Sequence, residues 1–224
     1  MSAEPAGEQP QIERVRDGVF FTLPDALPRG RHKLTREQVG EAQRERILAA
    51  VTELLAARGY RGFGVGDIAR RAGVSLGTLY GSFESKDACV FAGYDRFIEV
   101  LLRRMAAVDI PDLGPELTAA LIGAYLDTLQ QDLVVARAYQ VEIDALGPPA
   151  RARRRDALHL FAAFIRDRAE NAGPPVALPW SAYVGVVYAV RQLASDALDA
   201  EPAPDLALLA ADLHGWIADL FRPR

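Results

Sequence analysis

The stretch from Asp67 to Phe83 constrains the fold more than any other part of this chain. A short helical segment ends at Ala72, Gly73 follows it, and a second short helical segment begins after Ser75. Glycine adopts the backbone of a tight turn at little cost, and serine is a favoured residue at a helix N-terminus. The pattern therefore predicts a helix, a tight turn and a second helix that share a small apolar core.

Helical periodicity continues through most of the chain, and no segment convincingly shows the alternation of a strand. Thr35 and Gln38 have the spacing of a capping box, and Gly59 is placed to end that first helix near Arg58. Ser85 is placed to cap a later helix, and Gly-Pro segments separate the others. We predict an all-α fold of about nine helices, over residues 35–58, 67–72, 75–83, 85–107, 116–130, 132–146, 150–171, 179–199 and a last one after Pro204.

Length and composition indicate a soluble globular protein. The chain has 224 residues, of which half are hydrophobic and a quarter are charged. A single cysteine, Cys89, and three scattered histidines offer no set of metal ligands, so we expect no metal and no cofactor. The N-terminus lacks the pattern of a signal peptide, and the most apolar stretch, 176–190, is shorter than the roughly 18 residues of a membrane span. We therefore expect a cytoplasmic protein with no membrane partner.

Charge divides the chain into two parts. The formal net charge is −4, yet Arg29 to Lys86 holds eleven Lys/Arg against six Asp/Glu, and the remainder holds fifteen against twenty-four. A half that binds a polyanion and two solvated faces of opposite sign explain this distribution equally well.

Short motifs between residues 44 and 89 resolve that choice. They are, in order, Arg46 to Ala50, Gly59-Tyr60, Asp67 to Ala69, Ala72 to Ser75, Gly77 to Tyr80, Phe83, and Ser85 to Asp87. In this order and spacing they resemble the DNA-binding domain of the TetR family of transcriptional regulators. The basic segment 29–34 is similar to a lead-in found in part of that family.

The resemblance implies three parts of the chain. We expect a flexible N-terminal arm over 1–34, a helix-turn-helix DNA-binding domain over 35–84, and a helical domain over 85–224. The last would bind an effector and form a homodimer, as a palindromic DNA site requires.

The resemblance also implies DNA-contacting residues, because a short helix fits the major groove of DNA. Gly77 would permit close approach, and a lysine at the start of the next helix would approach a phosphate. Few long side chains are present, so reading by DNA shape and by an arm in the minor groove is also expected; a disordered solubilising tail is the alternative for that arm. The expected contacts are Ser75, Leu76, Gly77, Thr78, Tyr80, Ser82 and Lys86, with Arg29, Arg31 and Lys33 in the arm.

Polar groups on otherwise apolar helices are the candidates for effector binding. They are Tyr125, Tyr139, Glu142, His159, Tyr183 and Arg191. Arg191 or His159 could anchor a carboxylate or phenolate on a mainly apolar molecule. Apolar stripes on the last two helices, with Trp180, Tyr188, Leu206, Leu213, Trp216, Ile217 and Leu220 among their members, predict a dimer seam or, alternatively, only intrachain core.

The function predicted from these features is that of a bacterial dimeric repressor, which binds a palindromic operator and is released by a small, mainly apolar effector. An effector-independent or activating regulator controlled by a protein partner is the alternative. An enzyme is disfavoured because the chain has no HxxxH motif, nucleophile elbow or tight acidic pair.

Overall fold

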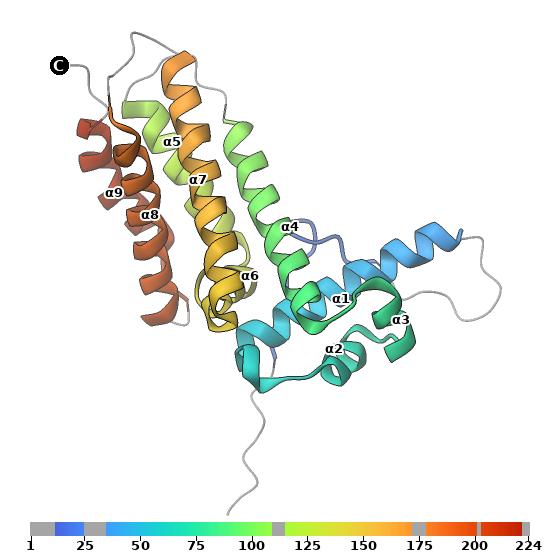
Figure 1. The fold of residues 1–224 in the computed structure, drawn as a ribbon. Coiled ribbons are helices and arrows are strands. Elements are labelled where there is room, and N and C mark those ends of the chain that lie inside the picture. Colours follow the sequence, from blue (N-terminus) through green and yellow to red (C-terminus); the bar gives the residue numbers. More distant parts are fainter. Residues whose placement is uncertain (1–11, 25–34, 109–114, 172–177, 201–202, 221–224) are drawn as a thin grey trace, which may run out of the picture.

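The computed structural model describes residues 12–24, 35–108, 115–171, 178–200 and 203–220. Over these residues the chain forms nine α-helices and two short 3-10 helices, η1 and η2, without a β-strand (Figure 1). The predicted all-α fold is confirmed. The elements are α1 (Arg36–Arg58), η1 (Tyr60–Gly62), α2 (Val65–Ala72), α3 (Leu76–Ser82), α4 (Lys86–Ala106), α5 (Pro115–Gln131), α6 (Leu133–Gln140), η2 (Glu142–Leu146), α7 (Pro148–Asn171), α8 (Trp180–Ala200) and α9 (Leu206–Leu220).

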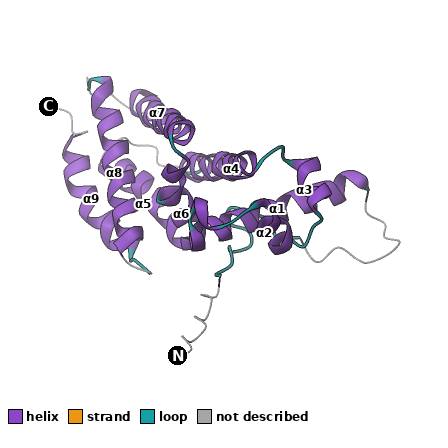
Figure 2. Ribbon diagram, turned by 60° about the horizontal axis from the view of Figure 1, so that its bottom comes forward, coloured by secondary structure: helices purple, strands orange, loops and turns teal. Residues whose placement is uncertain are grey.

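The helices form a small N-terminal unit and a larger bundle. Helices α1, α2 and α3 pack together, and α4 leads from them into the bundle of α5 to α9 (Figure 1). In the bundle α9 lies against α5, and α7 lies against α8. Figures 1 and 2 both place α3 at the opposite end of the molecule from α8 and α9. No helix in the described ranges combines the length and apolar character needed to cross a membrane.

Local capping sets the first helix as the sequence predicted. The Thr35 side chain accepts the Gln38 N–H at 3.1 Å, and the Gln38 side chain accepts the Thr35 N–H at 2.9 Å, which completes the capping box. At the other end α1 stops at Arg58, where Gly59 has a positive φ of 63°.

The segment 132–146 differs from the single helix that we predicted. It divides into α6 and η2 after Gln140, because the Gln140 carbonyl accepts hydrogen bonds from two α8 side chains. Arg191 donates to it at 2.6 Å and Ser195 at 3.2 Å. Side chains thus satisfy a carbonyl at the helix end that the main chain leaves without an intrahelical partner.

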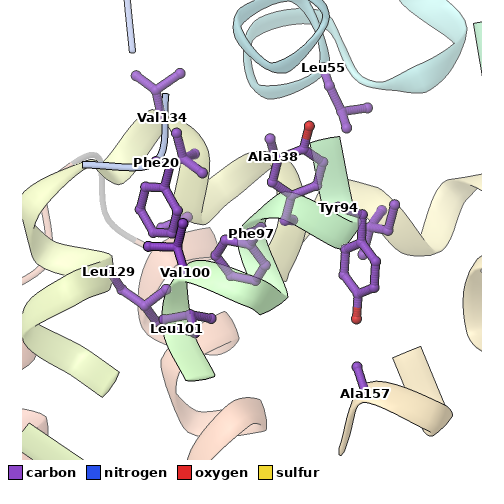
Figure 3. Packing of buried hydrophobic residues seen from close by; sticks show 14 of the residues in the cluster. Phe20, Leu55, Tyr94, Phe97, Val100, Leu101, Leu129, Val134, Ala138 and Ala157 are labelled. Atoms are coloured by element: carbon purple, nitrogen blue, oxygen red, sulfur yellow. The ribbon is translucent and has the colours of Figure 1, made fainter. Parts of the chain in front are cut away.

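The apolar core runs from the N-terminal unit into the bundle. Figure 3 shows part of it, with Leu55 of α1, Phe97 and Val100 of α4, and Val134 of α6. The Phe20 ring, from the segment before α1, stacks on Phe97 with 5.4 Å between centroids. The two units are therefore joined by packed side chains.

The predicted flexible arm over 1–34 is wrong for residues 12–24. Val15, Phe20 and Phe21 are buried, with Phe20 only 2% exposed. A turn at Gly18, whose φ is 78°, lets its N–H donate to the Phe21 carbonyl at 2.9 Å. The apolar cluster at Phe20 has no helical period, and it is ordered because α1, α4 and α6 offer apolar surface for it to cover. Arg29, Arg31 and Lys33 lie outside the described residues.

Candidate DNA-binding interface

The helix-turn-helix forms as the sequence predicted. Helix α2 ends at Gly73, which is left-handed with φ 66° and ψ 36°. Ser75 is then the N-cap of helix α3, and its hydroxyl accepts the Thr78 N–H at 3.0 Å. The turn between the two helices needs a residue with positive φ, and glycine supplies it with little strain.

Helix α3 has a buried face and an exposed face. Leu79 and Phe83 are buried against the N-terminal unit. Leu76 and Tyr80, four residues apart on the same face, are 50% and 55% exposed. Gly77, beside them, is exposed as well. The structure thus presents a large apolar and an aromatic side chain to the outside on a helix of seven residues.

The hydroxyl groups of α3 are held by the helix itself. The Ser75 and Thr78 hydroxyl oxygens lie 2.9 Å apart, and the Ser82 hydroxyl donates to the Thr78 carbonyl at 3.2 Å. A hydroxyl has one proton and two acceptor lone pairs, so these groups keep acceptor capacity for an outside partner. Thr78 and Ser82 are half-buried, whereas Ser75, at the N-cap, and Tyr80 are exposed.

Lys86, the expected phosphate contact, is held by partners within the chain. Its ammonium group donates to the Phe63 carbonyl at 2.6 Å and to the Tyr60 carbonyl. It also lies 4.0 Å from the centre of the Tyr60 ring and 4.1 Å from the centre of the Phe63 ring. Burial lowers the pKa of Lys86. Burial and the hydrogen bond donated to Asp87 raise the pKa of Tyr60 to about 12. Two rings and two carbonyls therefore turn Lys86 inward, where it fastens the start of α4 to η1.

Sequence reasoning missed Arg44 of α1. Its guanidinium lies 4.4 Å from the centre of the Phe83 ring, and Nη1 is 3.5 Å from the Ser82 carbonyl. Arg44 therefore places positive charge at the C-terminal end of α3, where the helix dipole favours a cation. No local pattern marks this residue, because its partners lie 38 or more positions further along the chain.

Two of the effector candidates meet inside the bundle. Gln140 donates to the Tyr125 hydroxyl at 2.6 Å, and Arg191 donates to the Gln140 carbonyl. Burial raises the pKa of Tyr125 and lowers that of Arg191, which Asp144 partly offsets. Neither Gln140 nor Ser195 was singled out from the sequence, although both join these residues in one buried polar cluster.

Asp144 lies at the edge of this polar cluster. One of its carboxylate oxygens pairs with Arg154 and lies 3.7 Å from Arg191. The other, Oδ1, is buried and has no hydrogen-bond partner among the described residues. A buried oxygen left without a donor is costly, and a ligand donor would satisfy it.

The other effector candidates lie elsewhere. Tyr139 is a core residue that is only 1% exposed. Its hydroxyl oxygen lies 2.8 Å from that of Thr52 in α1. Glu142 lies beside Gly59 at the end of α1, where burial raises its pKa. His159 is exposed on α7 and contacts the Trp180 ring edge to face.

Tyr183 is buried on α8, where burial raises its pKa. Glu170 and Arg166, both near the end of α7, are charged groups that act on it. The six predicted residues therefore do not form one site.

The apolar stripes of α8 and α9 are divided between two surfaces. Leu206, Leu213 and Ile217 are buried within the chain, so the intrachain reading is correct for them. A second set remains exposed on these helices, comprising Trp180, Tyr188, Leu193, Leu208, Trp216 and Leu220.

Comparison with known proteins agrees with this geometry. Residues 47–92 match the family model described as bacterial regulatory proteins, tetR family. No curated protein matches the chain. Solved structures share its fold, among them the fatty acid degradation regulator FadR from Bacillus halodurans, with a TM-score of 0.66, 20% identity, and coverage of 81% of this chain and 97% of that one.

Two further structures are similar. The transcriptional regulator FadR from Bacillus subtilis, in complex with stearoyl-CoA, has a TM-score of 0.63 and 19% identity, with 77% of this chain and 96% of that chain covered. A transcriptional regulator from Rhodococcus sp. Rha1 has a TM-score of 0.57 and 25% identity, with 80% and 92% covered.

An N-terminal helix-turn-helix joined to a larger helical bundle defines a DNA-binding regulatory protein. The match over 47–92 and the shared fold make the assignment more specific. Residues 47–92 carry the DNA-binding domain of the tetR family of bacterial regulatory proteins, and the chain as described shares the fold of solved TetR-family regulators.

Proposed function

We propose that this protein represses transcription by binding a palindromic operator as a homodimer, and that a small, mainly apolar effector releases it. In this proposal residues 35–84 read DNA, and residues 85–224 bind the effector and form the dimer. The observation that carries the proposal is the exposed face of α3, with Leu76 and Tyr80.

Glycine at position 81 supports a close approach of DNA to α3. A Cβ added at Gly81 would meet no described atom within 4 Å, so packing inside the chain does not require glycine there. Glycine in a helix costs about 0.5–1 kcal/mol relative to alanine. An outside partner that lies against the helix backbone gives a reason for it.

Contacts to DNA are assigned by chemistry. Leu76 is suited to a thymine methyl group in the major groove, and the Tyr80 hydroxyl to a phosphate or a base edge. The hydroxyl groups of Ser75, Thr78 and Ser82 would add hydrogen-bond acceptors close to the backbone of α3. We keep Arg29, Arg31 and Lys33, outside the described residues, as minor-groove contacts.

The effector is proposed to bind beside the buried polar cluster of Tyr125, Gln140, Arg191 and Asp144. An apolar bundle with a few convergent polar groups is the usual setting for a molecule with an apolar body and one polar group. The complex of the Bacillus subtilis relative with stearoyl-CoA makes acyl compounds the first class to test. In one form of the dimer the two α3 helices would fit the operator, and in another form they would not. An effector that binds the second form more tightly would lower operator affinity by the difference between its binding free energies for the two forms.

The homodimer is proposed to form through the exposed apolar residues of α8 and α9. Tyr188, Trp216 and Leu220 are large apolar side chains that a monomer would leave in water. A two-fold axis beside these helices would present two copies of α3 to one face of DNA.

Gel-shift titration of an operator tests the proposal. Leu76→Ala should weaken binding by about thirtyfold, since one lost apolar contact of about 1 kcal/mol in each of the two subunits sums to about 2 kcal/mol. Leu160→Ala is the matched control, because Leu160 is 57% exposed on α7, outside the N-terminal unit. Equal affinity of both variants and the parent protein would overturn the assignment of α3.

A further inference from the structure

Two neighbouring amide groups before α1 bridge the two units of the protein. The Val15 N–H donates to Glu53 of α1 at 3.1 Å, and the Arg16 N–H donates to Asp132, at the start of α6, at 2.6 Å. Residues 12–24, which we call the clasp, thus hold a carboxylate of the N-terminal unit and a carboxylate of the bundle side by side.

On the N-terminal unit the clasp reaches two helices. The Glu53 carboxylate also accepts a hydrogen bond from Arg71 Nε of α2 at 2.5 Å. The Arg71 guanidinium donates as well to the Ile12 carbonyl, at 3.1 Å. Eight residues earlier on α1, Glu45 accepts the Thr22 N–H at 3.3 Å. The two anchor points on α1 are separated by about 12 Å at 1.5 Å per residue, so together they resist rotation of the helix.

On the bundle the clasp shares a helix cap. Asp132 is 1% exposed, and its second carboxylate oxygen accepts the Val135 N–H at 3.2 Å, which caps α6. Phe20 adds the stack on Phe97 of α4, within the cluster shown in Figure 3. Arg96 of α4 completes the connection by donating to Glu45 at 3.0 Å.

The position of the clasp matters because α3 lies far from α8 and α9 (Figures 1 and 2). A rotation of about 6° at the end of a lever of about 30 Å, the length of a 20-residue helix, moves the far end by about 3 Å. The rise of one base pair is about 3.4 Å. A small change at the junction therefore changes the half-site spacing that a dimer fits.

We infer that the clasp determines half-site spacing, by fixing the angle between the α1–α3 unit and the bundle through the shared carboxylates of Glu53 and Asp132. This inference rests on the proposed binding of a palindromic operator as a dimer. It assigns a specificity role to residues that do not touch DNA.

Asp132→Asn is the test variant, because asparagine remains a good helix cap. Its single carbonyl oxygen can accept the Val135 N–H, but its NH₂ group then faces the Arg16 N–H, and two donors cannot pair. The bridge to the bundle is lost while α6 keeps its cap. Asp127→Asn, at an exposed position on α5, is the matched control.

Dissociation constants are measured on palindromic duplexes whose half-sites are moved together or apart by one or two base pairs. The parent protein and Asp127→Asn should prefer one spacing sharply. In Asp132→Asn the ratio between the affinities for the preferred spacing and for the shifted spacings should fall by about tenfold or more, the effect of one lost hydrogen bond to a charged group. Phe20→Leu loosens the clasp on α4 and keeps its apolar character. It should lower the same ratio of affinities.

The outcomes separate the inference from the proposed function. Sharp and identical spacing preferences in the parent protein, Asp132→Asn and Phe20→Leu would overturn the role of the clasp and leave operator binding intact. Failure of the parent protein to bind any of these duplexes would overturn the proposed function itself, and the clasp would lose its role with it.

Discussion

Replacement of Lys86 by methionine distinguishes an internal role from a contact with DNA. In the structure the ammonium group donates to two carbonyls and lies over two rings. A hydrogen bond to a charged group contributes about 1.5–3 kcal/mol, and a cation–π contact at a partly exposed site about 0.5–1 kcal/mol. Because the side chain is half-buried and water can reach the freed carbonyls, we expect a net loss of about 2–3 kcal/mol rather than the sum.

Two assays check this expectation. In thermal unfolding, Lys86→Met should lower the midpoint by about 5–10 °C for a chain of this size. In operator binding, the slope of log affinity against log salt should stay as in the parent protein, because no phosphate contact is removed. A phosphate contact in each subunit would instead reduce the slope by about 1.8. Arg103→Met, an exposed charge on α4, controls for the loss of one cation. A reduced slope with unchanged stability would refute the internal role.

Three further predictions follow from the packing. A Cβ on Gly93 would fall 1.9 Å from the Tyr139 hydroxyl oxygen. Gly93→Ala should therefore lower the free energy of unfolding in urea by about 1–3 kcal/mol, and an unchanged value would contradict this packing. Burial raises the pKa of Asp132, so the folded state binds a proton more tightly than the unfolded chain, and stability from this group falls as pH rises above about 4. Asp132→Asn should remove that part of the pH dependence, and identical slopes of stability against pH in both proteins would show that the group does not titrate this way. Trp216→Glu should convert a dimer to a monomer in size-exclusion chromatography with light scattering, whereas a persistent dimer would exclude α9 from the interface.

The helix boundaries could be predicted from sequence where the signals are local. The capping box at Thr35, the turn at Gly73 and the cap at Ser75 each depend on contacts within four residues. A single chain segment contains all the chemistry that such a signal needs. These elements position α3, so the geometry of the candidate interface followed from them.

The remaining features depend on distant partners. Phe20 is ordered by Phe97, and Lys86 is turned inward by Tyr60 and Phe63, which no periodicity links to it. The break after Gln140 is stabilised from α8, more than 50 positions away. Sequence patterns identify such residues as apolar or charged, but the fold decides which partners they meet.

Selection of bound DNA from a random pool tests the central claim most directly. If α3 reads the major groove in each of two identical subunits, the enriched sequences will contain two inverted half-sites at one fixed separation. Leu76→Ala in the same selection should relax the preference at one position of each half-site. Enrichment of a single asymmetric site, or of no sequence at all at low salt, would contradict the dimeric reading of DNA by α3.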